Sequence, residues 1–238
     1  MSVSEEIVEI LTNGTVKHAV NAPKMDLNNV DENIKNFVDL STTIGEFGIQ
    51  LLDGTPSEIK ITFAGNLVKN DTSLITRTIV SNILKEDLGN DVNIINALAI
   101  LNQQGVTYNI EKQKKHSSFS NYIELELSND NNQIKIGATV LAGFGPRIVR
   151  INNFSLDFKP NQYQIVTCHK DKPGIVDQTG NLLGNHGINI ASMTLGHDDD
   201  EGGDALMILS IDQQASGEVI NVLDLSLIHI SEPTRPLY

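Results

Sequence analysis

The chain has 238 residues, of which 39% are hydrophobic, enough for one large domain or two small ones with apolar cores. Its formal net charge of −13 opposes binding to nucleic acid, whose affinity depends on Lys and Arg neutralising phosphates. No uninterrupted apolar run approaches the ~20 residues that a membrane helix requires.

Two further features concern the cellular compartment. The single cysteine, Cys168, excludes an internal disulfide and is interpreted as a small core residue. The start, MSVSEEIVEIL, is acidic where a secretory signal is basic. We therefore expect no membrane association and a cytoplasmic protein.

The first 29 residues predict a short helix and a linker. Ser2 and Glu5 have the spacing of a capping box, and Asn13-Gly14 ends the helix. Its apolar face is too exposed to stand alone, and we expect it to pack against an N-terminal segment that this chain lacks. Residues 15–29, which include Pro23, have the composition of a linker.

Residues 30–160 predict an α+β domain. Apolar residues at helical spacing indicate one helix from Asp31 to about residue 52 and another after Asp71-Thr72. Alternating patterns indicate strands at 59–63, 106–111, 122–127, 134–140, 147–151 and 154–158. Because the helical segments come early and the strands late, we expect helices packed on one side of a mixed sheet.

Residues 161–224 predict a smaller domain of order βαββα, an incomplete ferredoxin-like unit that lacks its last strand. A strand leads through Asp171-Lys172-Pro173-Gly174 into a helix, two strands follow, and a second helix starts at Ser216. The tail 225–238 contains LSLIHISEPTR, which resembles the translation of a sequencing-library adapter. We interpret it as an artefact and exclude it from the fold.

Three blocks of the sequence resemble the D-3-phosphoglycerate dehydrogenase family. VSEEIVEILTNGTVKHAVNAPK is similar to the last helix of that family's nucleotide-binding region and its linker. FAGNLVKNDTSLITRTIVSNIL and GPRIVRINNFSLDFKP resemble its intervening, or allosteric substrate-binding, domain. KDKPGIVDQTGNLLGNHGINIASMTLG resembles an ACT domain.

The resemblance implies a regulatory part of an NAD-dependent enzyme of L-serine biosynthesis. The GxGxxG turn that binds NAD is absent, and so is the family's catalytic His segment. We therefore expect no catalytic residue, no metal and no cofactor in this chain, which alone is predicted to be inactive; NAD belongs to the complete enzyme. The family implies a homo-oligomer that forms through the ACT and intervening domains.

The same resemblance places an effector site between two ACT domains, at His169, Asp171 and Asn189. The chemistry of these residues fits an amino acid, and serine in particular. Asp171 can pair with an ammonium group, the amides that begin the helix after Pro173 favour a carboxylate, and Asn189 can both donate and accept. The alternative is that Asp171 only caps that helix and that His169 is a surface strand residue.

Other candidates carry weaker predictions. Arg147 and Arg150 are candidate anion-binding residues of the intervening domain, although strand alternation predicts that they lie on opposite faces. The basic run Lys112, Lys114, Lys115 and His116 is typical of a solvated loop, and the acidic residues 198–201 are typical of a hairpin turn rather than a calcium loop. His186 and His197 lack the spacing of zinc ligands.

Two other functions remain open. The β chain of an iron–sulfur L-serine dehydratase pairs similar domains, but its Ser-Ser-Ser-His-Thr-type motif is missing and one cysteine provides no cluster ligands. A free-standing amino-acid-binding ACT module is the other alternative.

Overall fold

The structure is a computed structural model that describes residues 32–197, 203–226 and 230–231. The helix predicted near the N-terminus and the acidic turn 198–201 lie outside these residues. Of the described helices, none is both long and apolar enough to cross a membrane.

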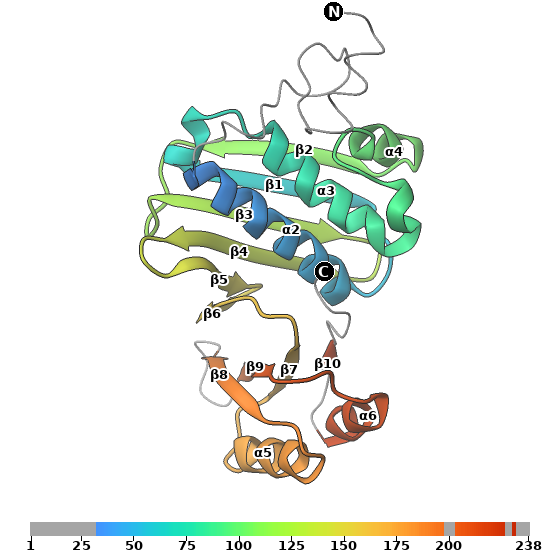
Figure 1. Ribbon diagram of the computed structural model, residues 1–238, viewed down its shortest axis with the longest axis vertical. Helices are drawn as coiled ribbons and strands as arrows, with labels where there is room; N and C mark the ends of the chain where they lie inside the picture. The colour runs from blue at the N-terminus through green and yellow to red at the C-terminus, as the bar shows by residue number, and fades with distance from the viewer. Residues whose placement is uncertain (1–31, 198–202, 227–229, 232–238) are drawn as a thin grey trace, which may run out of the picture.

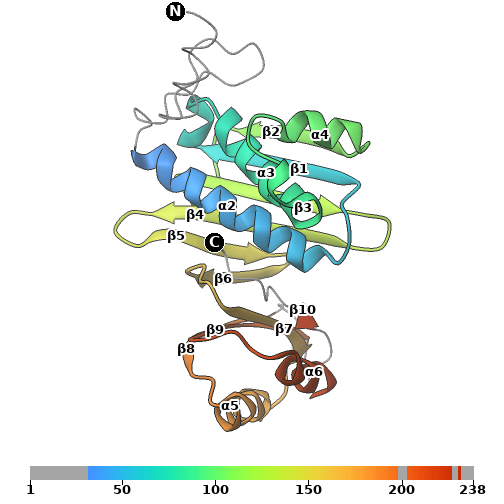
Figure 2. The same cartoon turned by 45° about the vertical axis from the view of Figure 1, so that its right-hand side comes forward.

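The first domain is a six-stranded mixed sheet with helices on one face (Figures 1 and 2). Its strand order is β2-β1-β3-β4-β5-β6, in which only β1 and β2 pair in parallel. The strands are β1 (Glu58–Gly65), β2 (Thr107–Gln113), β3 (Asn121–Ser128), β4 (Gln133–Leu141), β5 (Gly145–Ile151) and β6 (Phe154–Phe158). The helices are α2 (Glu32–Leu52), α3 (Ser73–Leu88) and α4 (Ala97–Gln103), with short 3-10 turns η1 (Asn66–Lys69) and η2 (Gly89–Asp91).

The helices form where the apolar spacing predicts them. Phe37, Leu40, Ile44 and Phe47 of α2 are at most 3% exposed and face the sheet. Strand alternation supplies the opposite side of the core, since Ile59, Ile61 and Phe63 are fully buried and their neighbours Lys60 and Thr62 face the other way. The predicted α+β arrangement is therefore confirmed.

The second domain is a four-stranded antiparallel sheet covered on one face by two helices. It contains β7 (Gln164–Lys170), α5 (Ile175–Asn185), β8 (Ile190–His197), β9 (Asp204–Ile211), α6 (Gly217–Ser226) and β10 (Ile230–Ser231). The order β10-β7-β9-β8 is that of a ferredoxin-like fold. The sequence predicts no strand after the second helix; this prediction is wrong, because Ile230 and Ser231 pair with Thr167 and Val166 of β7. The short β10 lies within the adapter-like tail.

The apolar core of the large domain extends into the second domain, which also has a core of its own. Residues 165, 207, 209 and 211 face α5 and α6, whereas Val166, Leu206 and Ile208 on the other face of the small sheet join the core of the large domain. Gly196 of β8 lies directly against β6, and a Cβ atom placed there would come 2.7 Å from Leu156 Cδ2. The helix-free face of the small sheet therefore packs against the β6 edge of the large one.

Candidate functional site

His169 and Asp171 lie at the end of β7, where the chain turns toward α5. His169 is 5% exposed, so it is not the surface residue of the alternative interpretation. Its Nδ1 lies 3.0 Å from the carbonyl oxygen of Lys170, and its Nε2 is buried with no hydrogen-bond partner among the described residues. A buried imidazole nitrogen without a partner is costly, and a ligand or water could satisfy it.

Asp171 is exposed and carries an ion pair. Its Oδ2 lies 3.2 Å from Nδ1 of His197, at the end of β8. The two groups form an ion pair when that histidine is protonated. The backbone N–H of Asp171 donates to the carbonyl oxygen of Gly203, so the loop is fixed against the start of β9. The aspartate therefore makes no side-chain helix cap that the structure records, and its carboxylate faces solvent.

The turn ends with Gly174, whose φ of 95° lies in the left-handed region that glycine tolerates, and α5 starts at Ile175. The first helical hydrogen bond runs from the N–H of Gln178 to the carbonyl oxygen of Gly174. The three amides before Gln178 are the free donors of the helix start, and they favour a carboxylate at this end of the loop.

Asn189 lies far from this loop within one chain. β9 pairs His169 with Ala205 at one end, whereas at its other end Ile211 pairs with Ile190, the residue after Asn189. The backbone of Asn189 is held there by Asp212, whose Oδ1 accepts from the Asn189 N–H at 3.1 Å. A single domain thus brings His169 and Asp171 together and keeps Asn189 at the opposite end of the sheet.

The predicted opposite orientation of Arg147 and Arg150 is wrong. Arg147 pairs with Thr139 and Arg150 with Gly137, two positions of β4 that point to the same face. The extra residue of a β-bulge, Val149, lies between them and reverses the alternation. Both arginines lie on the helix-free face of the large sheet.

Both guanidinium groups already have partners in the structure. Arg147 Nε donates to Asp157 Oδ1 at 2.6 Å, and its Nη2 lies 3.4 Å from the backbone oxygen of the same residue. Arg150 Nε donates to the carbonyl oxygen of Asn152 at 2.7 Å. As anion-binding residues they remain a prediction, and an anion would compete with these contacts.

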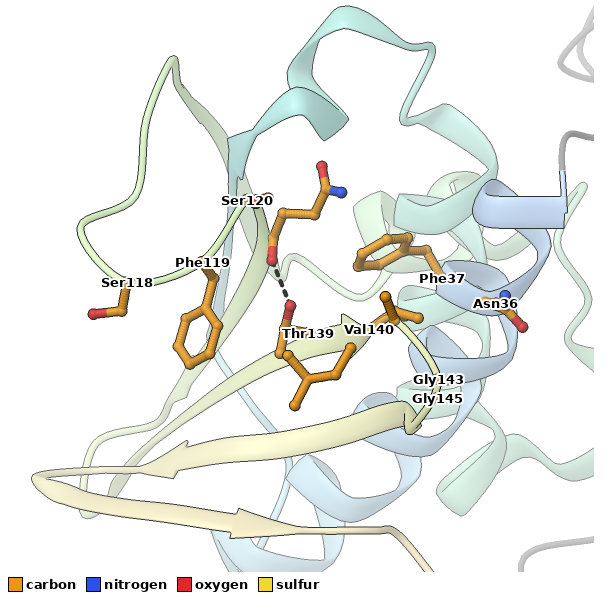
Figure 3. A pocket seen from close by; sticks show the side chains of 12 residues that line it. Asn36, Phe37, Ser118, Phe119, Ser120, Thr139, Val140, Gly143 and Gly145 are labelled. Atoms are coloured by element: carbon orange, nitrogen blue, oxygen red, sulfur yellow. Dashed lines mark hydrogen bonds between the residues drawn. The ribbon is translucent and has the colours of Figure 1, made fainter.

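A cavity of about 550 Å³ opens at the end of the large sheet where β3 begins and β4 ends. We call it the β3–β4 cavity; it is lined by Asn36, Phe37, residues 118–121, residues 139–143 and Gly145. Figure 3 shows Phe37 and Phe119 on opposite sides, with Thr139 and Val140 between them. Thr139 Oγ1 donates to the backbone oxygen of Asn121, which fixes the floor of the cavity. No pattern in the sequence predicts this cavity.

Metal-ligating groups and the cysteine thiol are two further kinds of reactive group to place. No group of three or more His, Cys, Asp or Glu side chains within those residues is arranged to hold a metal ion. Cys168 is half-buried, and burial raises the pKa of its thiol, as does the Asp204 carboxylate, so the thiol form is favoured over the nucleophilic thiolate.

Comparison with known proteins places both domains. The sequence model of the D-3-phosphoglycerate dehydrogenase intervening domain matches residues 33–152, half of the chain. The chain belongs to this family. The model of the ACT domain matches residues 163–224, from the start of β7 to near the end of α6.

Curated D-3-phosphoglycerate dehydrogenases are similar over nearly the whole chain. The protein from Bacillus subtilis is 30% identical over 93% of this chain and 42% of its own length. Those from Archaeoglobus fulgidus and Methanocaldococcus jannaschii are 28% and 26% identical over 92% and 96% of this chain. The chain spans about two fifths of the length of these relatives. It is the regulatory, ACT-containing region of a D-3-phosphoglycerate dehydrogenase.

The family assignment divides the candidate residues between the two domains. The intervening domain contains the β3–β4 cavity and the arginine pair, and the ACT domain contains His169, Asp171 and Asn189. The three ACT residues are candidates through the resemblance to ACT domains, and as effector-binding residues they remain a prediction. His197, which contacts Asp171, had no signal in the sequence because the end of β8 reaches the β7–α5 loop only in the folded sheet.

Proposed function

We propose that this chain senses an amino acid, L-serine, for an NAD-dependent D-3-phosphoglycerate dehydrogenase in the cytoplasm. NAD and hydride transfer would belong to other parts of the enzyme, because the sequence contains no GxGxxG turn. The observation that supports sensing is the buried Nε2 of His169, which has no partner among the described residues, two positions before the exposed carboxylate of Asp171. A bound amino acid could satisfy both at once.

Each group of the effector has a matching group on this loop. The ammonium would pair with Asp171 and displace His197, the carboxylate would accept from the free amides that start α5, and the hydroxyl would lie near His169. Asn189 would come from a second chain, because within one domain it lies at the other end of β9. The proposed site is therefore shared by two ACT domains related by symmetry.

Serine binding would act on the intervening domain through the part of the apolar core to which both domains contribute. Val166 and Cys168 lie on the opposite face of β7 from His169, and they face the large domain. A ligand that fixes β7 in one ACT pair would favour one arrangement of the two domains over others, which is how a binding energy biases a conformational equilibrium.

Calorimetric titration of L-serine into the chain tests the proposal. We expect binding to be lost in an Asp171→Ala variant and retained in Glu218→Ala, which removes one carboxylate from the first turn of α6, outside the proposed site. Two control ligands test the side chain: D-serine has the opposite configuration at Cα, and glycine lacks the hydroxyl group. Absence of serine binding in a folded, dimeric sample would contradict the assignment.

A further inference from the structure

The two edges of the large sheet differ in what covers them. The β6 edge packs against β8 of the ACT domain, whereas β2 forms the opposite edge, remote from that domain (Figures 1 and 2). Within the described residues, no strand pairs with the outer side of β2. An edge strand of this kind presents a row of unpaired backbone groups with which another strand can pair.

Apolar side chains lie beside this open edge. Tyr108 and Ile110 pair with Ile59 and Ile61 of β1, so their side chains lie on the helix-covered face of the sheet. Ile59 and Ile61 are fully buried, but Tyr108 and Ile110 are each 38% exposed. The helices therefore leave the outer strand partly uncovered, and apolar side chains on an unpaired edge are a liability unless another strand covers them.

The open backbone groups of β2 belong to alternate residues. The N–H of Thr107 donates to the carbonyl oxygen of Ser57 at 3.0 Å, so the backbone of Thr107 faces β1. Since backbone groups alternate in direction along a strand, those of Tyr108, Ile110 and Lys112 face away from β1. Ile110 is the middle residue of the seven-residue strand.

We propose that β2 pairs antiparallel with β2 of a second copy of this chain, about a two-fold axis through Ile110. In this register Ile110 lies opposite Ile110 of the second copy, and the two residues exchange both N–H···O bonds. Tyr108 lies opposite Lys112 of the second copy and pairs in the same way. The two six-stranded sheets become one continuous sheet, with the helices of both copies on the same face.

The side chains of β2 complement themselves in this register. The ammonium of Lys112 meets the ring of Tyr108, a favourable pair, and all seven residues of the strand are paired. Glu111 lies opposite Asn109 and already pairs with Lys60 of its own chain at 2.8 Å, so it brings no unpaired charge to the contact. A register centred on Glu111 or Lys112 sets like charges opposite each other, and one centred on Asn109 pairs only residues 107–111.

This contact is separate from the effector site. The β2 edge and the ACT domain lie at opposite ends of the molecule (Figure 1), so pairing through β2 leaves the ACT domain free for a contact of its own. A chain that makes both contacts joins more than two copies. Pairing through β2 requires no serine, and the proposal stands or fails separately from the proposed function.

Disulfide cross-linking of the full chain tests the contact, in a Cys168→Ala background that removes the single cysteine. The Cα atoms of two opposite hydrogen-bonded residues are about 5.5 Å apart, within reach of a disulfide. An Ile110→Cys variant should therefore form a covalent dimer at least about tenfold faster than Gln113→Cys. Gln113 is an exposed residue of the same strand, but its counterpart in the second copy lies about 20 Å away in this register.

The register is tested by mixing two variants, one of which carries a tag. Thr107→Cys and Gln113→Cys lie opposite each other, so their mixture should form a mixed disulfide, whereas neither variant alone should cross-link. Equal rates for Ile110→Cys and Gln113→Cys would overturn the contact. Pairing of this edge with any other segment of the chain would prevent all of these cross-links and would also overturn it.

The sign of one charge gives a measurement without cysteines. Tyr108→Glu sets a carboxylate opposite Lys112 of the second copy, and Tyr108→Lys sets a second ammonium there. Both variants lose the same ring, and the two-fold axis repeats each pair. Sedimentation equilibrium should show at least about tenfold weaker association for Tyr108→Lys than for Tyr108→Glu. Equal association of the two variants would contradict the proposed register.

Discussion

The contact between β6 and β8 predicts that a larger side chain at Gly196 destabilises the packing of the two domains. A Cβ at this position would lie 2.7 Å from Leu156 Cδ2, 3.2 Å from Phe154 Cβ and 3.2 Å from the carbonyl oxygen of Ser155. Carbon atoms in favourable contact are about 3.5–4.0 Å apart. The Leu156 methyl can move away, but the Ser155 carbonyl belongs to the backbone of β6 and cannot do so cheaply.

Two effects of opposite sign set the size of the change. Overpacking in a closed core costs about 1–3 kcal/mol. Replacing glycine within a strand returns about 0.5–1 kcal/mol of backbone entropy. Gly196→Ala is therefore expected to be nearly neutral, whereas Gly196→Val, with two more methyl groups against β6, should lower the free energy of unfolding by about 1–2 kcal/mol.

Urea unfolding followed by circular dichroism measures this difference. Ala191→Val, an exposed position on the same strand, is the control and should change the free energy of unfolding by less than about 0.5 kcal/mol. If Gly196→Val is as stable as the control, β6 and β8 do not pack as the structure shows.

The remaining predictions concern single residues of the large domain. Asp71 Oδ1 accepts from the N–H of Ser73 at the start of α3, and this bond lowers the pKa of Asp71. Asp71→Ala should therefore cost about 0.5–1 kcal/mol at pH 7 and less as the pH falls through the depressed pKa, measured by unfolding at several pH values. Burial raises the pKa of Glu46, with a smaller opposing effect of Lys85. Glu46→Gln should thus raise stability at pH 7 and change it little at pH 4, where the native carboxyl is already protonated; equal effects at both pH values would contradict this. Gly65→Ala should lower the free energy of unfolding by more than about 2 kcal/mol, since φ of Gly65 is 80° and the backbone of Ser120 blocks the Cβ. A smaller decrease in thermal unfolding would show that the loop containing Ser120 can move away.

Local patterns in the sequence predict most of the fold. The spacing of Phe37, Leu40, Ile44 and Phe47 is enough to identify α2 and its buried face, because an amphipathic helix repeats every 3.6 residues. Alternation does the same for β1 and β3. These signals are local, and the tertiary contacts of the folded chain agree with the local preference for helix or strand.

The misses arise where the structure depends on one extra residue or on distant contacts. The bulge at Val149 turns Arg150 to the face of Arg147, and no residue in GPRIVRI marks a bulge. The basic run 114–116 has the composition of a solvated loop, yet its stacking on Tyr122 sets it over a hollow. The β3–β4 cavity is lined by residues of α2, β3 and β4 that only the folded sheet brings together.

The candidate residues of the ACT domain are a third case: the sequence supplies the residues, and the structure shows where each one lies. The resemblance to ACT domains implies His169, Asp171 and Asn189 together, but only the strand register shows that Asn189 lies at the far end of β9. A site that contains all three must therefore include two chains.

Complementation between two inactive variants tests that central claim most directly. Asp171→Ala and Asn189→Ala chains should each fail to bind L-serine in calorimetry. When they are unfolded and refolded together in equal amounts, half of the dimers are mixed and each mixed dimer has one intact site, so about a quarter of the normal stoichiometry should return. No recovery from a mixture shown to contain mixed dimers would contradict a site shared between two chains.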